Sequence, residues 1–268
     1  MLSQVEYSEA QKLFHGSIPR VMGTKLDLVT VGTDRVQIEP VWEELCAYAE
    51  RLDSILNRFD SQSEVARFNA MEDRSAVSMS SELSELMSLG VEYWNRTEGL
   101  FDICRGRMTA LNFNEDGSVS VSDPDLKLDF GGLAKGYFMK MVDEKLRKAG
   151  VRSAFVDFGN SAILGVGRHP FGDSWIVSLP NPYSGSVVAE LRVCDRAIST
   201  SGNAPGYTGH IVHPTTGKAC IDRKMVTVVS ANPLDAEVLS TVMMLADKGQ
   251  EIRIRRSFPD AQINTYSL

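Results

Sequence analysis

The chain has 268 residues, of which 43% are hydrophobic and 24% charged, and its formal net charge is −7 at pH 7. This composition is typical of a globular protein with a substantial core, and the acidic balance argues against a nucleic-acid-binding protein, which needs a basic surface. The four cysteines are far apart and form no pair at the spacing of a zinc site, which favours reduced thiols over a disulfide framework.

The sequence contains no run of about 18 apolar residues, so it predicts no transmembrane helix. The first 20 residues lack a basic start followed by an apolar block, so no signal peptide is expected. These features predict a cytoplasmic protein, or an exported one whose leader has been removed.

The first 60 residues predict an arm, a strand and a long helix. Residues 1–20 are polar and are expected to form a loose arm or a short helix. Residues 21–32 alternate as a strand does, with Leu26, Leu28 and Val31 expected in the core. Apolar residues fall on one helical face over 41–59, namely Trp42, Leu45, Ala49, Leu52, Leu56 and Phe59.

Two shorter helices and a hairpin are expected next. Residues 58–69 predict a turn with a short helix. Ser80 or Ser81 can cap a second helix that ends near Gly99 and buries Leu83, Leu86, Val91 and Trp94. Residues 112–125 predict a hairpin or loop, because Asp116-Gly117 is a typical turn pair.

The stretch from Leu128 to Gly150 predicts a strand, a glycine turn and a helix. Leu128, Asp129 and Phe130 are assigned to the strand, and two glycines follow, which allow the backbone to approach a ligand closely. Free N–H groups and the positive dipole end at the start of the helix suit an anionic ligand. An ordinary strand-to-helix corner remains the alternative.

The rest of the chain mixes strands with one helix. Strands are expected over 153–167, interrupted at Gly159, and over 173–182, 186–200 and 225–232. Residues 234–247 predict a short buried helix, and the last residues at most one or two edge strands. Because helices and strands do not alternate regularly, we expect one α+β domain rather than a doubly wound α/β fold.

Three segments contain residues suited to catalysis. Asp129-Phe130-Gly131 is also a protein kinase motif, but the other kinase motifs are missing, which excludes that class. Residues 197–219 are rich in hydroxyls and glycines and include His210 and His213, possible acid–base groups of a ligand-facing loop. The alternative is a solvated surface loop.

A carboxylate and a hydroxyl share one face of the last predicted helix. Glu237 and Thr241 are four residues apart, so both can face the same ligand. Their oxygens could hold a hard cation such as Mg²⁺, together with phosphate oxygens and water. An exposed pair without a metal is the alternative interpretation.

The order of these motifs resembles that of the FAD:protein FMN transferases, the ApbE-like family formerly linked to thiamine biosynthesis. The resemblance runs from about residue 21 to residue 248. It rests on seven collinear motifs: VMGT (21–24), RFDSQSEVARFN (58–69), GLFD (99–102), DFGGLAKGY (129–137), ISTSG (198–202), HIVHPTTG (210–217) and VTVVS (226–230).

The resemblance implies an α+β fold of mixed, mostly antiparallel sheets packed with helices, in a single flavin transferase domain spanning 1–268 with an arm over 1–20. It implies Mg²⁺-dependent transfer of FMN from FAD to a Thr or Ser hydroxyl of an acceptor flavoprotein, with release of AMP. The implied FAD site comprises Met22, Phe59, Leu100, Phe101, Asp102, Gly131, Tyr137 and Ile211. Mg²⁺ would be held by Glu237, Thr241 and the Ala134 carbonyl. Our own candidates for the catalytic residues are His210, Asp129 and Lys135.

Three positions depart from the family pattern. Glu237 stands where the family usually has Asp, His213 replaces the Asp of the H-I-x-D-P motif, and Asn203 replaces the Asp after TSG. The loss of acidic side chains near one site keeps a second hypothesis open. In that hypothesis the protein binds FAD but has lost transfer, and acts as a flavin carrier or regulator or hydrolyses FAD.

Overall fold

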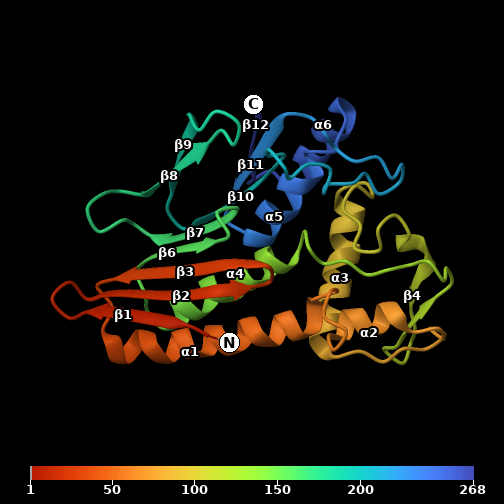
Figure 1. Ribbon diagram of the computed structural model, residues 1–268, viewed down its shortest axis with the longest axis horizontal. Helices are drawn as coiled ribbons and strands as arrows, with labels where there is room; N and C mark the ends of the chain where they lie inside the picture. The colour runs from red at the N-terminus through yellow and green to blue at the C-terminus, as the bar shows by residue number, and fades with distance from the viewer. Residues whose placement is uncertain (1) are drawn as a thin grey trace.

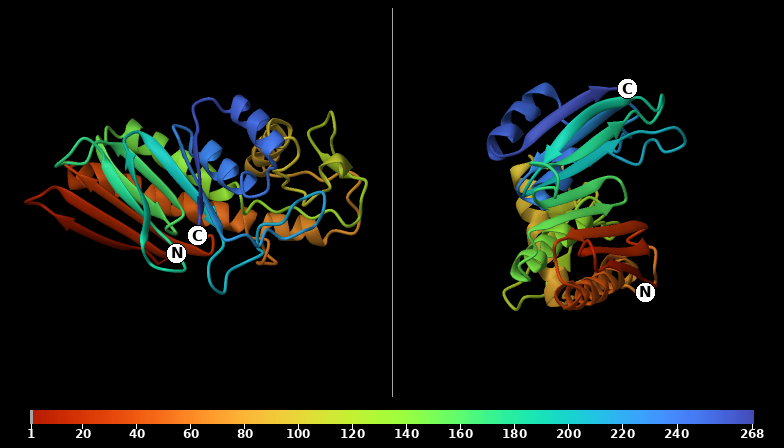
Figure 2. Two further views of the ribbon diagram at one scale, coloured as in Figure 1. Left: turned by 90° about the horizontal axis from the view of Figure 1, so that it is seen from above. Right: turned by 90° about the vertical axis from the view of Figure 1, so that its left-hand side faces the viewer.

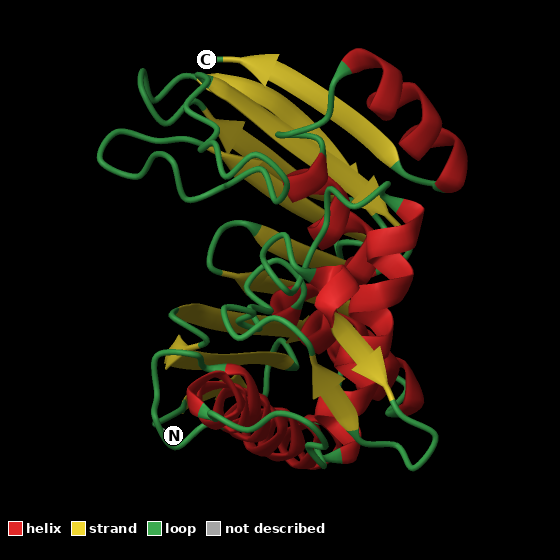
Figure 3. Cartoon of the chain, turned by 90° about the vertical axis from the view of Figure 1, so that its right-hand side faces the viewer, coloured by secondary structure: helices red, strands yellow, loops and turns green. Residues whose placement is uncertain are grey.

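An eight-stranded antiparallel sheet is the main element of the structure, a computed structural model that describes residues 2–268 (Figure 1). Its two edge strands, β1 and β12, place the chain ends at opposite edges of the sheet (Figure 1). The strands stack from the N-terminal to the C-terminal edge (Figure 3). In sheet order they are β1 (Gln4–Ser8), β2 (Leu13–Val21), β3 (Thr24–Val31), β6 (Ser153–Phe158), β7 (Ala162–Gly167), β10 (Arg196–Gly202), β11 (Lys224–Ser230) and β12 (Gln262–Ser267).

Three helices cover one face of this sheet. Helix α1 (Arg35–Leu56) packs on β2 and on α4 (Ala134–Lys148), while α5 (Pro233–Val242) packs on β10, β11 and α4. The opposite face is covered in part by the hairpin of β8 (Trp175–Pro180) and β9 (Val187–Val193), around Trp175 and Val193. Alternate residues of β7, β10 and β11 point to opposite faces of the sheet and therefore enter two separate hydrophobic clusters.

The remaining elements extend the molecule beyond one end of the strands, where α3 and the β4–β5 hairpin lie (Figure 2). They are α2 (Glu64–Ala70), α3 (Ser81–Arg96), the 3₁₀ turn η1 (Met108–Ala110), β4 (Leu111–Phe113), β5 (Val119–Val121) and α6 (Lys248–Ser257). In the described residues 2–268, no helix is long and apolar enough to cross a membrane.

Most of the helix predictions are confirmed. Ser80 caps α3 by accepting a hydrogen bond from the Leu83 N–H at 3.2 Å. Helix α4 ends at Lys148, and Gly150 just after its C-cap has a positive φ of 75°, which suits glycine. The hairpin over 112–125 is also present, as β4 and β5.

Two assignments at the ends of the chain are wrong. Residues 1–20 contain strands β1 and β2 and are not a loose arm or helix. Phe14, Gly16 and Ile18 face the core, and the polar residues between them, such as His15, hide this alternation. At the C-terminus the expected edge strand is present as β12, but IRIRR, which alternates like a strand, lies in helix α6, whose start Asp247 and Gln250 fix with a capping box.

Two central assignments are also wrong. Leu128, Asp129 and Phe130 belong to no sheet, because Leu128 is bound by the side chain of Asn69 and the Asp129 N–H donates to the Ile103 carbonyl. Phe59 lies beyond the end of α1 and is 84% exposed, so it is no part of that helix's core face.

Helices α4 and α5 touch where Gly136 has no side chain. A Cβ at this position would lie 2.8 Å from Glu237 Cβ and 2.9 Å from the Pro233 carbonyl oxygen, which is too close for either neighbour to tolerate. The contact places the first turn of α4 against Glu237.

Gly136→Ala is therefore expected to destabilise the fold by about 1–3 kcal/mol, because the two helices must move apart. Denaturant unfolding would measure the change. Gly249→Ala, in helix α6 where the nearest atoms are 3.3 Å from the added Cβ and belong to side chains, is the matched control and should be neutral or stabilising. An unchanged unfolding midpoint in Gly136→Ala would contradict this account of the helix contact.

Candidate active site

A cavity of about 1260 Å³ lies where the ends of several strands meet α5 and the loops around α2 and α3. Its walls come from the β2–β3 turn, the turn after α1, residues 100–107 and 125–135, the β6–β7 turn, the end of β10, the loop over 207–217 and the buried face of α5. Segments far apart in sequence thus share one site, which is large enough for a dinucleotide.

Twelve of the fourteen residues singled out from the sequence line this cavity: Met22, Phe59, Leu100, Phe101, Asp102, Asp129, Gly131, Lys135, His210, Ile211, Glu237 and Thr241. Tyr137 and Ala134 do not. Tyr137 is only 4% exposed, and burial together with the neighbouring Tyr48 raises the pKa of its hydroxyl, so the side chain belongs to the core. Ala134 is the first residue of α4, between the lining residues Gly132 and Lys135.

The turn before α4 leaves a helix N-terminus facing the cavity. No side chain caps this end of α4, and its first turn contains no acidic residue. Asp129 accepts a hydrogen bond from the Gly131 N–H at 3.0 Å and lies 3.4 Å from Arg58 Nε, which fixes the glycine turn. The free N–H groups and the dipole therefore favour an anion at this wall.

A buried carboxylate and an ammonium face each other between α4 and α5. Lys135 Nζ forms a hydrogen-bonded ion pair with Glu237 Oε1, and Ser199 donates to Glu237 Oε2 at 2.8 Å. The Glu237 side chain is 5% exposed and that of Lys135 21%. Because an unpaired buried carboxylate is costly, the Lys135 ammonium offsets the cost of placing Glu237 here.

A chain of hydroxyls connects Glu237 to Thr241. Ser240 lies 3.1 Å from Ser199 and 2.8 Å from Ser201, and Ser201 lies 3.4 Å from Thr241, measured between side-chain oxygens. These side chains come from β10 and α5, so the packing of this helix on this strand assembles the network. Within residues 2–268 the Thr241 hydroxyl forms only this one weak hydrogen bond, and Thr241 lines the cavity.

The residues present fit a magnesium ion that takes most of its ligands from a substrate. Glu237 and Thr241 supply hard oxygen donors one helical turn apart on the cavity wall. Residues 2–268 contain no group of three His, Cys, Asp or Glu that could hold a metal by themselves. Mg²⁺ commonly binds through one or two protein oxygens plus phosphates and water, which matches this donor set.

Asp102 shapes a second wall of the cavity. Its carboxylate accepts hydrogen bonds from the Cys104 N–H at 2.6 Å and the Gly106 N–H at 3.0 Å, so it folds the turn that presents Arg105. Burial raises the pKa of Asp102, and these N–H groups oppose that shift. A Cβ on Gly106 would lie 2.2 Å from the Pro214 carbonyl oxygen, so the turn meets the loop of His210 and His213.

Asn203, one of the departures from the family pattern, closes the loop over 204–222. It is 1% exposed, and its amide Nδ2 donates to the carbonyl oxygens of Cys220 at 3.0 Å and Asp222 at 2.9 Å. An aspartate has no donor for either bond when ionised. Asparagine is therefore the residue that this loop requires, and its presence does not remove a carboxylate from the cavity wall.

His210 lies on this loop and stacks on Tyr207, with ring centroids 4.1 Å apart and planes at 25°. Partial burial lowers the pKa of His210 below its ordinary value of 6.5. The imidazole is therefore neutral at pH 7 and can accept a proton. His213, which also lines the cavity, accepts a hydrogen bond from the Thr215 N–H at 3.3 Å and contributes no negative charge.

Several lining residues were not identified from the sequence, notably Arg58, Arg105, Ser201 and Tyr207. Arg58 and Ser201 lie inside two of the motifs quoted from the sequence, but nothing in those motifs singled them out as cavity residues. Arg105 stands in a turn set by Asp102, and no periodicity points to it.

A model of the ApbE family matches residues 22–117 and 108–263. An FAD:protein FMN transferase from Klebsiella pneumoniae (strain 342) is 22% identical over 87% of this chain and 79% of its own length. One from Vibrio cholerae is 24% identical over 75% of this chain and 72% of its own.

Solved structures give the same fold. The flavin transferase ApbE from Vibrio cholerae superposes with a TM-score of 0.79 at 20% identity, covering 98% of this chain and 97% of its own. The apo flavinyl transferase ApbE from Pseudomonas stutzeri gives 0.78 at 23% identity, covering 98% and 90%. These likenesses confirm the mixed α+β fold.

Proposed function

Because the chain belongs to the ApbE family, we propose that it is an FAD:protein FMN transferase. It moves FMN from FAD to a threonine or serine hydroxyl of an acceptor flavoprotein and releases AMP. The observation that carries this proposal is the large cavity that joins the uncapped N-terminus of α4 to Lys135, Glu237, Thr241 and His210. The names of the relatives, FAD:protein FMN transferase, support the same activity.

The pyrophosphate of FAD is assigned to the wall formed by Gly131, Gly132 and Lys135. A Cβ on Gly132 would lie 3.2 Å from the Phe101 ring and 3.9 Å from the Thr241 hydroxyl, so glycine keeps this space open. The N–H groups of α4 and the Lys135 ammonium supply positive charge there. Apolar lining residues, including Met22, Phe101 and Ile211, suit the flat rings of the nucleotide.

Glu237 and Thr241 would hold Mg²⁺ beside these phosphates, because their side chains supply two hard oxygen donors. When bound, the ion would neutralise negative charge that develops on the phosphates during bond cleavage. Glu237 Oε1 is bonded to Lys135 in this structure, so the ammonium must share or release that oxygen.

In the transfer itself, the acceptor hydroxyl oxygen forms a bond to the phosphorus of the FMN half. The bond from that phosphorus to the bridging oxygen breaks, and AMP leaves with the electron pair. His210 accepts the hydroxyl proton, because its imidazole is neutral at pH 7 and faces the cavity. Arg58 and Asp129 keep the glycine turn in place without taking part in the bond changes.

The pH dependence follows from the lowered pKa of His210. Below that pKa the imidazole is protonated and cannot accept the hydroxyl proton, so the rate should hold from pH 8 to pH 6.5 and fall at lower pH. Measuring kcat for transfer over this range checks the expectation. His210→Asn should be slower by about 10²–10⁴-fold and should lose the acidic limb. An acidic limb that persists unchanged in His210→Asn would assign it to another group.

The test of the function is a mass measurement. The protein is incubated with FAD, Mg²⁺ and domains or peptides that carry a threonine or serine acceptor site, and the acceptor mass is recorded. A gain of one FMN adduct that depends on Mg²⁺ supports the transferase. FAD binding without an adduct, over several acceptors, would refute it.

One observation favours a second function, FAD binding or hydrolysis without transfer. Lys135 and Ser199 each form a hydrogen bond with one of the two Glu237 oxygens, so a metal would have to share these oxygens with them. AMP release without an acceptor adduct would identify the hydrolase, and bound, unchanged FAD would identify the carrier or regulator.

A further inference from the structure

Three serine hydroxyls lie in a line between Glu237 and Thr241, behind the α5 wall of the cavity. Ser199 and Ser240 are 3% and 0% exposed and do not line the cavity, so neither can touch FAD or an acceptor. Ser201 and the two ends of the line do reach the cavity. Any effect of the buried serines on the reaction is therefore exerted through these three residues.

The carboxylate of Glu237 sets the direction in which the hydroxyls donate. Paired with the Lys135 ammonium, the carboxylate only accepts, and its Oε2 takes the one proton of Ser199 at 2.8 Å. Ser240 has two acceptors for its own proton, Ser199 Oγ at 3.1 Å and the Glu237 carbonyl oxygen at 3.0 Å. With either choice, Ser240 has no proton left to donate to Ser201.

The proton of Thr241 then has one position. Ser201 donates to Ser240 across 2.8 Å, so its oxygen is the acceptor for Thr241 at 3.4 Å. This pattern puts a proton in four of the five contacts, whereas donation from Ser240 to Ser201 would put one in only three. The Thr241 proton therefore points toward β10, which leaves the oxygen lone pairs for a ligand in the cavity.

We propose that Ser240 and Ser201 are positioning residues for the cation, because the hydroxyl chain anchored on Glu237 keeps the Thr241 proton away from it. The inference rests on the proposed transferase function, in which Mg²⁺ lies beside the FAD phosphates. A hydroxyl binds a cation through its lone pairs, so a proton turned into the cavity would oppose the metal. Partners behind the ligands of a metal site typically change its affinity by about 10- to 100-fold.

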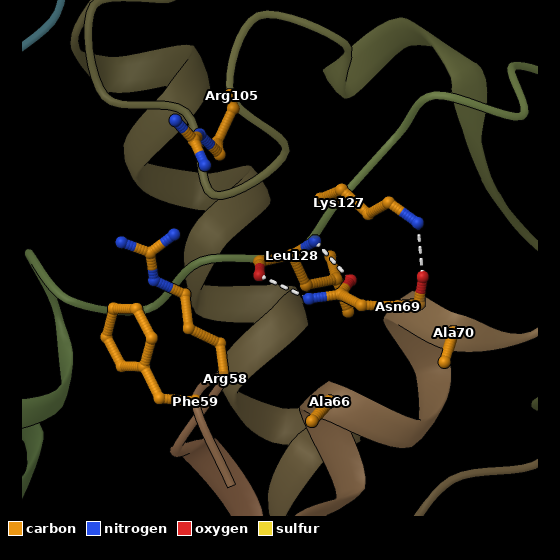
Figure 4. Close-up of a pocket in the computed structure, with 8 residues that line it drawn as sticks. All are labelled: Arg58, Phe59, Ala66, Asn69, Ala70, Arg105, Lys127 and Leu128. Atoms are coloured by element: carbon orange, nitrogen blue, oxygen red, sulfur yellow. Dashed lines mark hydrogen bonds between the residues drawn. The ribbon is translucent and has the colours of Figure 1, made fainter. Parts of the chain in front are cut away.

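Most of the cationic side chains of the cavity lie on a different wall. Arg58, Arg105 and Lys127 also line a smaller pocket of about 270 Å³ beside α2, and no residue of the hydroxyl chain does (Figure 4). At the α5 wall, Lys135 bonds Glu237 Oε1, whereas Ser199 donates to Oε2. The direction of the chain is therefore the same whether the ammonium or a metal neutralises the carboxylate.

The first test measures metal binding without any transfer. Mn²⁺, whose free ion gives an electron paramagnetic resonance signal, is titrated against the protein with saturating FAD and no acceptor. Ser240→Ala should weaken Mn²⁺ binding about tenfold, because Ser201 is then free to donate to Thr241 and to turn the threonine proton into the cavity. FAD affinity, measured by flavin fluorescence without metal, should stay the same. Ser88→Ala, whose hydroxyl donates to a carbonyl oxygen of its own helix α3, is the matched control.

A second set of variants tests whether the hydroxyls act as one chain. Ser201→Ala should also weaken Mn²⁺ binding about tenfold, whereas Ser201→Thr keeps the hydroxyl and should retain the affinity. The double variant of Ser201→Ala and Ser240→Ala should bind no more weakly than either single variant, because both changes break the same chain. In the transfer assay, the Mg²⁺ concentration for half the maximal rate should rise by the same factor, with kcat at saturating Mg²⁺ retained. If Ser240→Ala does not fold, the comparison of Ser201→Ala with Ser201→Thr decides.

The outcomes separate this inference from the proposed function. Unchanged Mn²⁺ binding in Ser240→Ala, or single effects that multiply in the double variant, overturns the hydroxyl chain. Equal losses of Mn²⁺ and FAD affinity with a lower Tm also overturn it, because they assign the Ser240 hydroxyl to the packing of α5 on β10. Mn²⁺ binding that depends on both serines, without FMN transfer to any acceptor, leaves the chain standing and refutes the transferase function.

Discussion

Glu237→Gln is expected to lower the rate of FMN transfer by about 100- to 1000-fold, because it removes the only carboxylate on the α5 wall of the cavity. Glutamine keeps the length of the side chain and an oxygen that can accept from Ser199, so packing should survive. The charge that a hard cation requires is lost. The rate of adduct formation, measured by acceptor mass at several Mg²⁺ concentrations, gives the effect.

The same change should cost some stability. Lys135 loses its ion-pair partner, but its side chain faces the cavity and is 21% exposed, so water can solvate the ammonium. We expect a loss of about 1–3 kcal/mol, below that of a fully buried pair. Glu251→Gln, on α6 and paired only with Arg255, is the control and should change neither rate nor stability appreciably. Full activity in Glu237→Gln would place the metal elsewhere.

Local sequence signals were reliable where one physical cause decided the structure. Ser80 as a helix cap and Gly150 as a helix end each depend on one residue's backbone or hydrogen-bonding preference. The buried stripe of α4 at Phe138, Val142 and Leu146 follows from helical periodicity alone. Such features require no knowledge of distant parts of the chain.

Features that depend on a distant partner were missed. The extended segment at Leu128 is held by Asn69, 59 residues away, and not by a neighbouring strand. Strand β2 has a half-buried His15 because Asp27 on β3 pairs with it at 3.0 Å, and neither residue alone predicts a strand. Sequence periodicity cannot detect such contacts, because it reports only on one element's own face.

In the candidate site, too, features of one short segment were predictable and contacts between distant segments were not. The motifs located ten of the twelve cavity residues, because each motif is a short segment that reaches the cavity from its own element, and helical spacing added Glu237 and Thr241. The bonds between segments were not foreseen. Lys135 was a candidate catalytic residue, and the structure pairs it with Glu237, 102 residues away, a partner that no motif named. Asn203 was interpreted as a lost carboxylate, although its amide donates two hydrogen bonds that close a loop.

Lys135→Met is expected to lower the transfer rate by about 100-fold at low Mg²⁺ and by less at high Mg²⁺. The ammonium forms the ion pair with the Glu237 carboxylate, and without it the buried carboxylate has no positive partner. A divalent cation can take over the neutralisation, so excess Mg²⁺ should restore part of the rate. The Mg²⁺ dependence of the rate, with FAD saturating, measures this.

A thermal melt separates this role from phosphate binding. If Lys135 neutralises Glu237, Mg²⁺ without FAD should raise the Tm of Lys135→Met by more than that of the unaltered protein, because only the variant has an uncompensated buried carboxylate. Lys140→Met, on the same helix and paired at the surface with Glu144, should respond to Mg²⁺ as the unaltered protein does. If Mg²⁺ restores neither rate nor stability in Lys135→Met while its KM for FAD rises, the ammonium serves the phosphates and not Glu237.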